Sequence, residues 1–565
     1  MTQSSSPSYQ YGSIPVVTLD TNNDEQHDTI THKKESSAAF FHHHRRPGCR
    51  ASGPILLAAG IALLFLAALY STASTTSTTH NKKKMWQKVQ RSPGDTPHYF
   101  SQKVDHFDSS NTDTWPQRYF IETKFFRGPG HPIILVVGGE GGIDTGMFYP
   151  FVDQYLAEHW GALVLHPEHR FYGVSQPVDP VTNEELVQLL TLPNAIEDML
   201  AIVRRFKNQY HCSLDKTSPH YCPVIAVGGS YPAFVATLMR IHYPDQVDIA
   251  YASSAPLKLW SMDADQFGYM DVVTRVTDQV APGCAQAVRE TLEAVDRQIR
   301  HVDDDYIHFA RHDLNICPGT IPTYITNAEL LSQEMMMIVG YTFADFNMFA
   351  YPPDHSTDLY DVCHHVFLND HYNTPTEKLS QFWKYVEFYN DNLLPCFDMS
   401  SQLPAGHHSS ISGADWSGVG VGYDGMMFDF HCCSTLTPAI GFSHESMFPY
   451  RPWTLEWLTQ HCERRFQVTP KPYKLLHMYH FDDLIRANAT KILFTNGLND
   501  MWSAGSLLES ISDDLPVINM VNGAHHSDLS NHPDDHLDTP DVVEAHQQIR
   551  AVLEQWLQEI RDQQY

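Results

Sequence analysis

The sequence is poor in basic residues and has only one long apolar run. Lys and Arg together number 37 against 66 Asp and Glu, which gives a formal net charge of −29. Nucleic-acid binding requires a basic surface to meet the phosphates, so this charge balance argues against a nucleic-acid partner. No CxxC pair and no His–Cys spacing suggests zinc, and we expect neither a metal nor a cofactor.

The single apolar run predicts a membrane anchor. It covers residues 51–73 and is continuously apolar over 55–70, which suffices for the roughly 20 residues that cross a bilayer. A cleaved signal peptide is the alternative, but its apolar region would be shorter and would not follow so long a polar segment. We therefore expect a disordered cytosolic tail at 1–50, a transmembrane signal anchor at 51–73 and a Ser/Thr-rich stem at 74–97.

The cysteines and a sequon indicate an oxidising lumen beyond the anchor. Cys49 adjoins the anchor, and the other nine cysteines all follow it. We expect a set of disulfides with one thiol left over, in a connectivity that the sequence leaves open. Asn488 begins the sequon Asn488-Ala489-Thr490, which is glycosylated only in that lumen. These features predict a single-pass type II membrane protein with a lumenal or extracellular catalytic part.

Two further features bear on the compartment. Tyr11 begins a Tyr-x-x-bulky pattern that resembles endosomal and lysosomal sorting signals. The chain also has 34 His, which reflect either surface composition or service in an acidic compartment, where His side chains become charged. We expect the endosome or lysosome, with the cell exterior as the alternative.

From His98 onward the chain alternates strand-like and helix-like segments. The expected strands are 132–137, 161–165, 223–227, 492–494 and 517–521. Residues 186–206 have helical spacing between two of them, and buried strands that alternate with helices predict a parallel sheet. Residues 260–480 break this rhythm with aromatic, Cys-rich and helical stretches. We expect an α/β core at 98–259 and 481–565, with the intervening segment inserted into it.

A nucleophile elbow is predicted where the strand at 223–227 ends. Gly228-Gly229-Ser230-Tyr231 lies between that strand and a helix, and such a sharp turn exposes the serine hydroxyl. The Tyr231 N–H, at the start of the helix, is placed to stabilise an oxyanion. The motif G-x-S-x-G requires glycine where Pro232 stands, although proline is tolerated in a first helical turn.

A serine nucleophile needs a base and an orienting carboxylate, which α/β-hydrolases supply in the chain order Ser, Asp, His. Asp500 follows the late strand, and His525 follows the last strand, so both order and strand context agree with a triad. Glu168, His169 and Arg170 allow two interpretations, as acid–base groups or as a structural ion-pair loop near the site.

At these residues the sequence resembles a known family. The similar blocks are Gln102 to Phe107, Gln117 to Phe120, Gly138 to Gly141, Glu168 to Ser175, Gly228 to Tyr231, Ala252 to Pro256, Asp500 to Ser503 and Gly523 to His526. From about His98 to its end, the chain looks like the proline-specific serine peptidases that include lysosomal Pro-X carboxypeptidase, dipeptidyl peptidase II and thymus-specific serine protease.

The resemblance implies an α/β-hydrolase core with a mostly helical cap inserted between Ser and Asp. It also implies acidic-pH cleavage of proline-containing peptides without a metal. By motif position, Ser230 is the nucleophile, Asp500 the orienting carboxylate and His525 the base. His526 is the neighbouring and alternative base, and Trp502 resembles a residue that lines the proline pocket. We assign the oxyanion hole to Tyr231 and Glu140.

Three residues depart from the family pattern: Pro232 in the elbow, Met501 in place of a proline after the Asp, and Ser530 in place of an arginine. We expect a serine-type exopeptidase that cleaves next to proline, with Pro-X carboxypeptidase as the leading interpretation. The alternatives are a dipeptidyl peptidase, a lipase or esterase, and an inactive hydrolase-fold binding protein. A homodimer is the expected assembly if the chain associates with itself.

Overall fold

The computed structural model describes residues 96–143, 149–389, 394–400, 415–420, 422–485 and 487–563. The predicted tail, anchor and nearly all of the stem lie outside the described residues. Within the described residues, no single helix is long and apolar enough to cross a membrane, and one bent pair, Asn183–Leu189 with Leu192–Gln209, passes that test only jointly.

The core is an eight-stranded sheet with the strand order β1-β2-β4-β3-β5-β6-β7-β8. The strands are β1 (His98–Lys103), β2 (Thr114–Glu122), β3 (Ile133–Val136), β4 (Leu163–Pro167), β5 (Val224–Gly229), β6 (Ile249–Ser253), β7 (Ile492–Gly497) and β8 (Val517–Met520). From β4 to β8 all pairs are parallel, which confirms the predicted α/β class. The antiparallel pair β1–β2 extends one edge and was not expected, because β1 is mostly polar and exposed.

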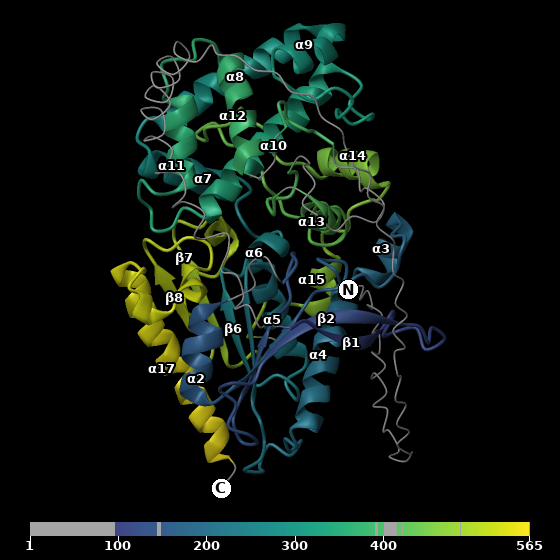
Figure 1. The fold of residues 1–565 in the computed structure, drawn as a ribbon, viewed down its shortest axis with the longest axis vertical. Coiled ribbons are helices and arrows are strands. Elements are labelled where there is room, and N and C mark those ends of the chain that lie inside the picture. The colour runs from purple at the N-terminus through teal and green to yellow at the C-terminus, as the bar shows by residue number, and fades with distance from the viewer. Residues whose placement is uncertain are drawn as a thin grey trace, which may run out of the picture. The chain divides into compact units, whose positions relative to one another are not determined.

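Helices cover both faces of this sheet, as Figure 1 shows. They are α2 (Ala157–Trp160), α4 (Leu192–Gln209), α5 (Tyr231–His242) and α17 (Pro540–Asp562), whereas α3 (Asn183–Leu189) lies beyond the end of the sheet. Alternate side chains of β3 and β5 point to opposite faces: Ile134 and Ile225 belong to the hydrophobic cluster that contains α17, whereas Leu135 and Ala226 belong to the one that contains α4 and α5. Period-two alternation of apolar residues thus builds two hydrophobic layers.

The helix predicted at 186–206 is broken. α3 ends at Leu189 and α4 begins at Leu192, with the Thr191 side chain accepting the Asn194 N–H as an N-cap. Pro193 then occupies the first turn of α4. A cap residue followed by proline starts a new helix, and this signal overrides the continuous apolar spacing.

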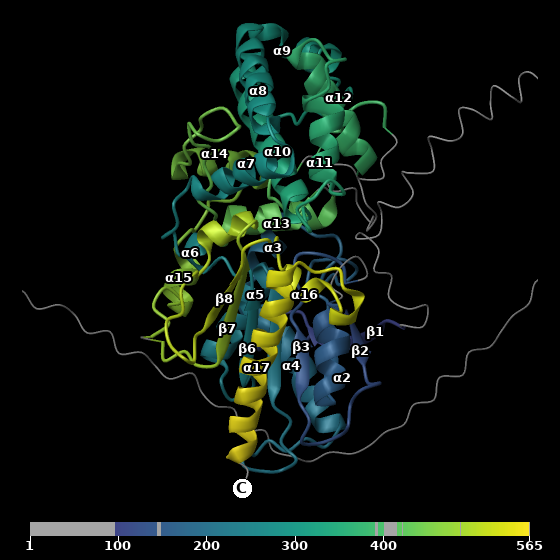
Figure 2. The same cartoon turned by 90° about the vertical axis from the view of Figure 1, so that its left-hand side faces the viewer.

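The chain leaves the sheet after β6 and returns at β7, and most of the intervening segment is helical. Its helices are α6 (Leu257–Trp260), α7 (Gly268–Val280), α8 (Cys284–His301), α9 (Tyr306–His312), α10 (Ala328–Met348), α11 (Asp358–Val362), α12 (Pro375–Tyr389), α13 (Tyr423–Ser434), α14 (Leu455–Phe466) and α15 (Lys474–Tyr479). Figure 2 shows α8 to α12 above one end of the sheet. This arrangement confirms the fold class, an α/β-hydrolase core with an inserted helical cap.

The insertion packs in two parts. Helices α7 to α12 share one hydrophobic cluster, to which the core contributes Met501 and Trp502. The buried side chains of α13 to α15 belong instead to the cluster that contains α4 and α5. The part of the insertion nearest β7 is therefore attached directly to the core.

Four disulfides join eight of the nine cysteines that follow residue 73 and leave Cys432 free and buried. They are Cys212–Cys222, Cys284–Cys363, Cys317–Cys396 and Cys433–Cys462. The prediction of a disulfide set with one remaining thiol is thus confirmed, and the structure supplies the connectivity. Such a set is typical of an oxidising compartment.

Candidate active site

Ser230 lies in a strained turn between β5 and α5. Its backbone φ is 65° and its ψ is −128°, outside the regions that a non-glycine residue readily adopts. The Ser230 N–H donates to the carbonyl oxygen of Ser253 at 2.9 Å, which anchors the turn to β6. This strand–turn–helix geometry is that of a nucleophile elbow, where strain holds the hydroxyl away from the sheet.

Pro232 fits the elbow because Gly228 makes room for it. A Cβ atom built on Gly228 would lie 2.3 Å from the Pro232 carbonyl carbon, so the strand and the helix touch through their backbones. Pro232 occupies the first turn of α5, where no intrahelical N–H is required. The close contact thus requires glycine at position 228 and accommodates proline at 232.

His525 and Asp500 are hydrogen-bonded to each other. The His525 Nδ1–H donates to Asp500 Oδ2 at 2.8 Å. The second carboxylate oxygen accepts the Trp502 N–H at 3.0 Å, and the Asp500 side chain is fully buried. With Nδ1 committed to the carboxylate, Nε2 is the ring nitrogen left to accept a proton.

His526 packs against the elbow. A Cβ atom on Gly229 would lie 2.7 Å from His526 Cγ and Cδ2, so the imidazole lies directly against this glycine. Among the described residues His526 Nδ1 has no hydrogen-bond partner, and burial holds its pKa well below the usual range. The hydrogen bond to Asp500 comes from His525, which favours His525 over its neighbour as the base.

Asp528 fixes the turn that carries both histidines. Its carboxylate is fully buried. It accepts hydrogen bonds from three hydroxyl groups, those of Tyr251 at 2.5 Å, Ser253 at 2.6 Å and Thr495 at 2.6 Å. These hydroxyls come from β6 and β7, so the carboxylate ties the histidine turn to the neighbouring strands. Sequence reasoning missed this residue, although its place three positions after His525 was a usable signal.

The loop after β3, residues 137–143, lies where α/β-hydrolases provide the second oxyanion donor. We call it the oxyanion loop. Burial raises the pKa of the Glu140 carboxyl to about 7, and its own backbone amide and nearby His525 only partly oppose this shift. Within the described part of the chain, the Glu140 N–H and the Tyr231 N–H donate to no other residue's carbonyl oxygen. The Tyr231 amide is therefore suited to bind an oxyanion, whereas the Glu140 amide also lies within reach of its own carboxyl.

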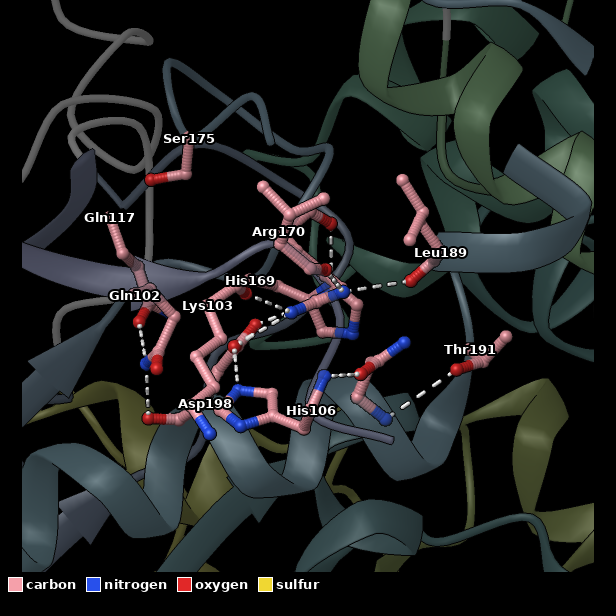
Figure 3. Close-up of polar contacts among 12 residues, drawn as sticks. Gln102, Lys103, His106, Gln117, His169, Arg170, Ser175, Leu189, Thr191 and Asp198 are labelled. Atoms are coloured by element: carbon pink, nitrogen blue, oxygen red, sulfur yellow. Dashed lines mark hydrogen bonds and ion pairs between the residues drawn. The ribbon is translucent and has the colours of Figure 1, made fainter. Parts of the chain in front are cut away.

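Glu168, His169 and Arg170 form buried structural contacts. Arg118 pairs with Glu168, and Arg170 donates to both oxygens of Asp198 at 2.6 and 2.8 Å. Figure 3 shows Arg170, Asp198 and His106 in one network that also holds backbone carbonyl groups. These contacts favour the structural ion-pair interpretation over the acid–base one.

His169 supports the residue that follows the nucleophile. Its Nδ1–H donates to the Arg170 carbonyl oxygen at 2.8 Å, so its Nε2 accepts the Tyr231 hydroxyl at 3.0 Å. Burial lowers the pKa of His169 to about 4, which keeps the ring neutral at higher pH. The Tyr231 side chain is thereby fixed behind the elbow, at the residue whose backbone N–H is assigned to the oxyanion hole.

Trp502 forms an aromatic wall beside the base. Its ring centroid lies 6.2 Å from that of His525 and 5.0 Å from that of Tyr269 in the cap, which it meets edge to face. The side chain is 3% exposed and belongs to the cap cluster. Trp502 therefore packs between the base and the cap.

The described residues also contain one cluster of possible metal ligands and one large groove away from the triad. Asp429, Cys433 and His461 lie close enough to hold a metal, but the Cys433 sulfur is in a disulfide and Asp429 pairs with Arg465. A groove of about 620 Å³ is bordered by α3, α4 and α15 and contains none of Ser230, Asp500 and His525. Neither feature offers an alternative catalytic centre.

Comparison with known proteins finds a matching family and similar peptidases. A family described as serine carboxypeptidase S28 matches residues 102–549. The chain is 27% identical to the lysosomal Pro-X carboxypeptidase of Mus musculus, over 77% of this chain and 84% of that protein. It is also 27% identical to the thymus-specific serine protease of Mus musculus, over 84% of this chain and 90% of that protein. Among solved structures, the Pyrococcus horikoshii acylaminoacyl peptidase has 16% identity and a TM-score of 0.21, over 31% of this chain and 25% of that one.

Proposed function

Because this chain belongs to the serine carboxypeptidase S28 family and is a serine-type peptidase, we propose that it hydrolyses peptide bonds next to proline through Ser230, Asp500 and His525. The observation that carries the proposal is the buried His525–Asp500 hydrogen bond beside the strained turn of Ser230. These groups come from the ends of β5, β7 and β8, where parallel strands bring them to one edge of the sheet.

In this mechanism the Ser230 hydroxyl attacks the scissile carbonyl carbon, and His525 takes the hydroxyl proton at Nε2. Asp500 holds the ring through Nδ1–H and stabilises the imidazolium that forms. The backbone amides of Tyr231 and Glu140 donate to the oxyanion. His525 then returns its proton to the leaving amine, and water hydrolyses the Ser230 ester in the second half of the reaction.

Labelling with a fluorophosphonate tests the nucleophile. Wild-type lumenal domain should label, and Ser230→Ala should not. The matched control is Ser510→Ala, which removes an exposed hydroxyl beside β8 and should label like wild type. Folded wild-type protein that does not label would favour a non-catalytic binding role. Turnover of fatty-acyl esters without turnover of proline peptides would favour a lipase or esterase.

The more specific proposal is a Pro-X carboxypeptidase, which releases the residue after proline. It is supported by the similarity to Pro-X carboxypeptidases over most of both chains. A dipeptidyl peptidase is the alternative, since the triad does not determine which peptide terminus is bound. Peptides that end in Pro-Phe and peptides that begin with Lys-Ala, incubated at acidic pH, separate the two. Release of Phe supports the proposal, whereas release of an intact N-terminal dipeptide alone contradicts it.

We further propose a lumenal catalytic domain held by an anchor at 51–73, in an endosome or lysosome. Asn488 is exposed, as an acceptor of glycan must be, although Thr490 of the same sequon accepts a hydrogen bond from Arg240 at 2.7 Å. Sensitivity to glycosidase and protection from added protease in intact vesicles would support this topology. A cytosol-exposed catalytic domain would contradict it, and sedimentation of the purified domain would test the proposed homodimer.

A further inference from the structure

Two carboxylates hold the oxyanion loop to a neighbouring loop, residues 171–175. Glu168 accepts the N–H groups of Ile143 and Val174, each at 3.1 Å. Asp424 accepts the N–H groups of Gly142 at 3.1 Å and Gly173 at 3.0 Å. Each carboxylate therefore spans both loops, and together they bind two consecutive amides in each.

The two loops touch through their backbones. Gly173 has a φ of +55°, and a Cβ atom there would lie 2.8 Å from the Gly142 Cα and 2.1 Å from a Glu168 carboxylate oxygen. No side chain fits at this contact, so the position of one loop determines that of the other. The oxyanion loop is thus held by backbone contact on one side and by the hydrogen bonds that its N–H groups donate to two carboxylates.

The two carboxylates differ in origin. Glu168 follows β4 in the core and pairs with Arg118. Asp424 lies in the first turn of α13, within the insertion, and is 282 residues from Gly142 along the chain. The same helix makes two further bonds to the core: the Tyr423 hydroxyl donates to Gln176 at 2.8 Å, and His431 Nδ1 bonds the Tyr172 hydroxyl at 3.0 Å.

We infer that Asp424 is a positioning residue for the oxyanion hole, so that the insertion completes the catalytic site of the core. The inference rests on the proposed function, because it assigns the Glu140 amide to the oxyanion. Asp424 acts by fixing Gly142, two residues beyond Glu140. A displacement of about 1 Å in a catalytic group can lower a rate roughly 100-fold, so a loosened loop should be visible in kinetics.

The test compares Asp424→Ala and Asp424→Asn with Tyr423→Phe, which removes the bond of the same helix to Gln176 at 2.8 Å and leaves the Asp424 carboxylate in place. We expect both Asp424 variants to lower kcat roughly 10- to 100-fold with KM nearly unchanged, since a lost oxyanion donor costs about 100- to 1,000-fold. Tyr423→Phe should stay within about threefold of wild type. A peptide boronate, which mimics the tetrahedral intermediate, should bind more weakly in proportion to the loss of kcat, whereas a product peptide should bind unchanged.

Several results would overturn this inference. Wild-type kcat in folded Asp424→Ala would do so, as would a rise in KM alone or an equal loss in Tyr423→Phe. If Asp424→Ala does not fold, Asp424→Asn decides, because it keeps the size of the side chain and one acceptor oxygen. Amide hydrogen exchange in the peptide that spans 138–143 should then be faster than in wild type, and unchanged exchange with unchanged kcat would refute the role. An inactive wild-type enzyme would instead refute the proposed function.

Discussion

The imidazole of His525 and the carboxylate of Asp500 are joined by a 2.8 Å hydrogen bond, and the carboxylate is fully buried. Because the bond occupies Nδ1, it selects the tautomer and the orientation in which Nε2 is the basic nitrogen. The backbone N–H of Trp502 bonds the other carboxylate oxygen, so the aromatic wall and the triad share one turn. Substitution of either partner in the His525–Asp500 bond should therefore disable the base.

Asp500→Asn should lower kcat by about 10⁴, because an amide in this place can favour the wrong tautomer of His525 while leaving the fold intact. His525→Ala should be at least as inactive, and Asp534→Asn, whose side chain is 87% exposed, is the matched control with wild-type rates. Steady-state kinetics on a Pro-Phe peptide measures all three. Activity of Asp500→Asn within about tenfold of wild type would contradict the assigned role of this carboxylate.

Gly229→Ala should disable the site through His526. The new methyl group would lie 2.7 Å from the imidazole, and the histidine turn would have to move away from the elbow. We expect kcat to fall about 100-fold or more, as for a misplaced catalytic group.

Gly319→Ala is the matched glycine control. No atom of the described residues lies within 4 Å of a Cβ atom there, although its φ is +82°. It should lower stability by about 1 kcal/mol through backbone strain and leave kcat unchanged. Equal kinetic effects of the two alanines would mean that contact with His526 is not the cause.

Arg170→Met tests the structural role of the buried ion pair in Figure 3. The substitution leaves the Asp198 carboxylate buried without its arginine, which should cost about 3–5 kcal/mol in the free energy of unfolding. Arg297→Met, which removes an exposed pair with Glu293, should cost less than about 1 kcal/mol. Urea unfolding measures both differences. Unchanged stability with lost activity in folded Arg170→Met would restore the acid–base interpretation.

The sequence predicted the parts of the site that depend on local pattern. Short apolar runs indicated β5, β7 and β8, and the residues just beyond them are the ones that the fold brings to one edge of the sheet. Asp424 could not be found in this way, because its partner Gly142 is 282 residues distant and a lone aspartate has no distinguishing pattern. The break between α3 and α4 was predictable from the Thr191 cap and Pro193. The apolar periodicity of residues 186–206 nevertheless favoured one continuous helix.

The pH dependence of activity should be set on its alkaline side by Glu140. Burial raises the pKa of this carboxyl to about 7, so it is neutral in acidic solution and becomes charged as the pH rises through that value. A negative charge on the oxyanion loop opposes the developing oxyanion, and kcat/KM should therefore fall as Glu140 ionises.

The raised pKa of Glu140 should also make the free energy of unfolding depend on pH. The folded state favours the neutral carboxyl. Its contribution to the free energy of unfolding is therefore fully present below pH 4.5, the ordinary pKa of the group, and is lost as the pH rises to about 7. Glu140→Gln keeps a neutral side chain of similar shape and should remove both effects. Comparison of pH–rate profiles and unfolding midpoints between about pH 4 and pH 8 measures them. Profiles that coincide in the two proteins would show that another group sets the alkaline limit.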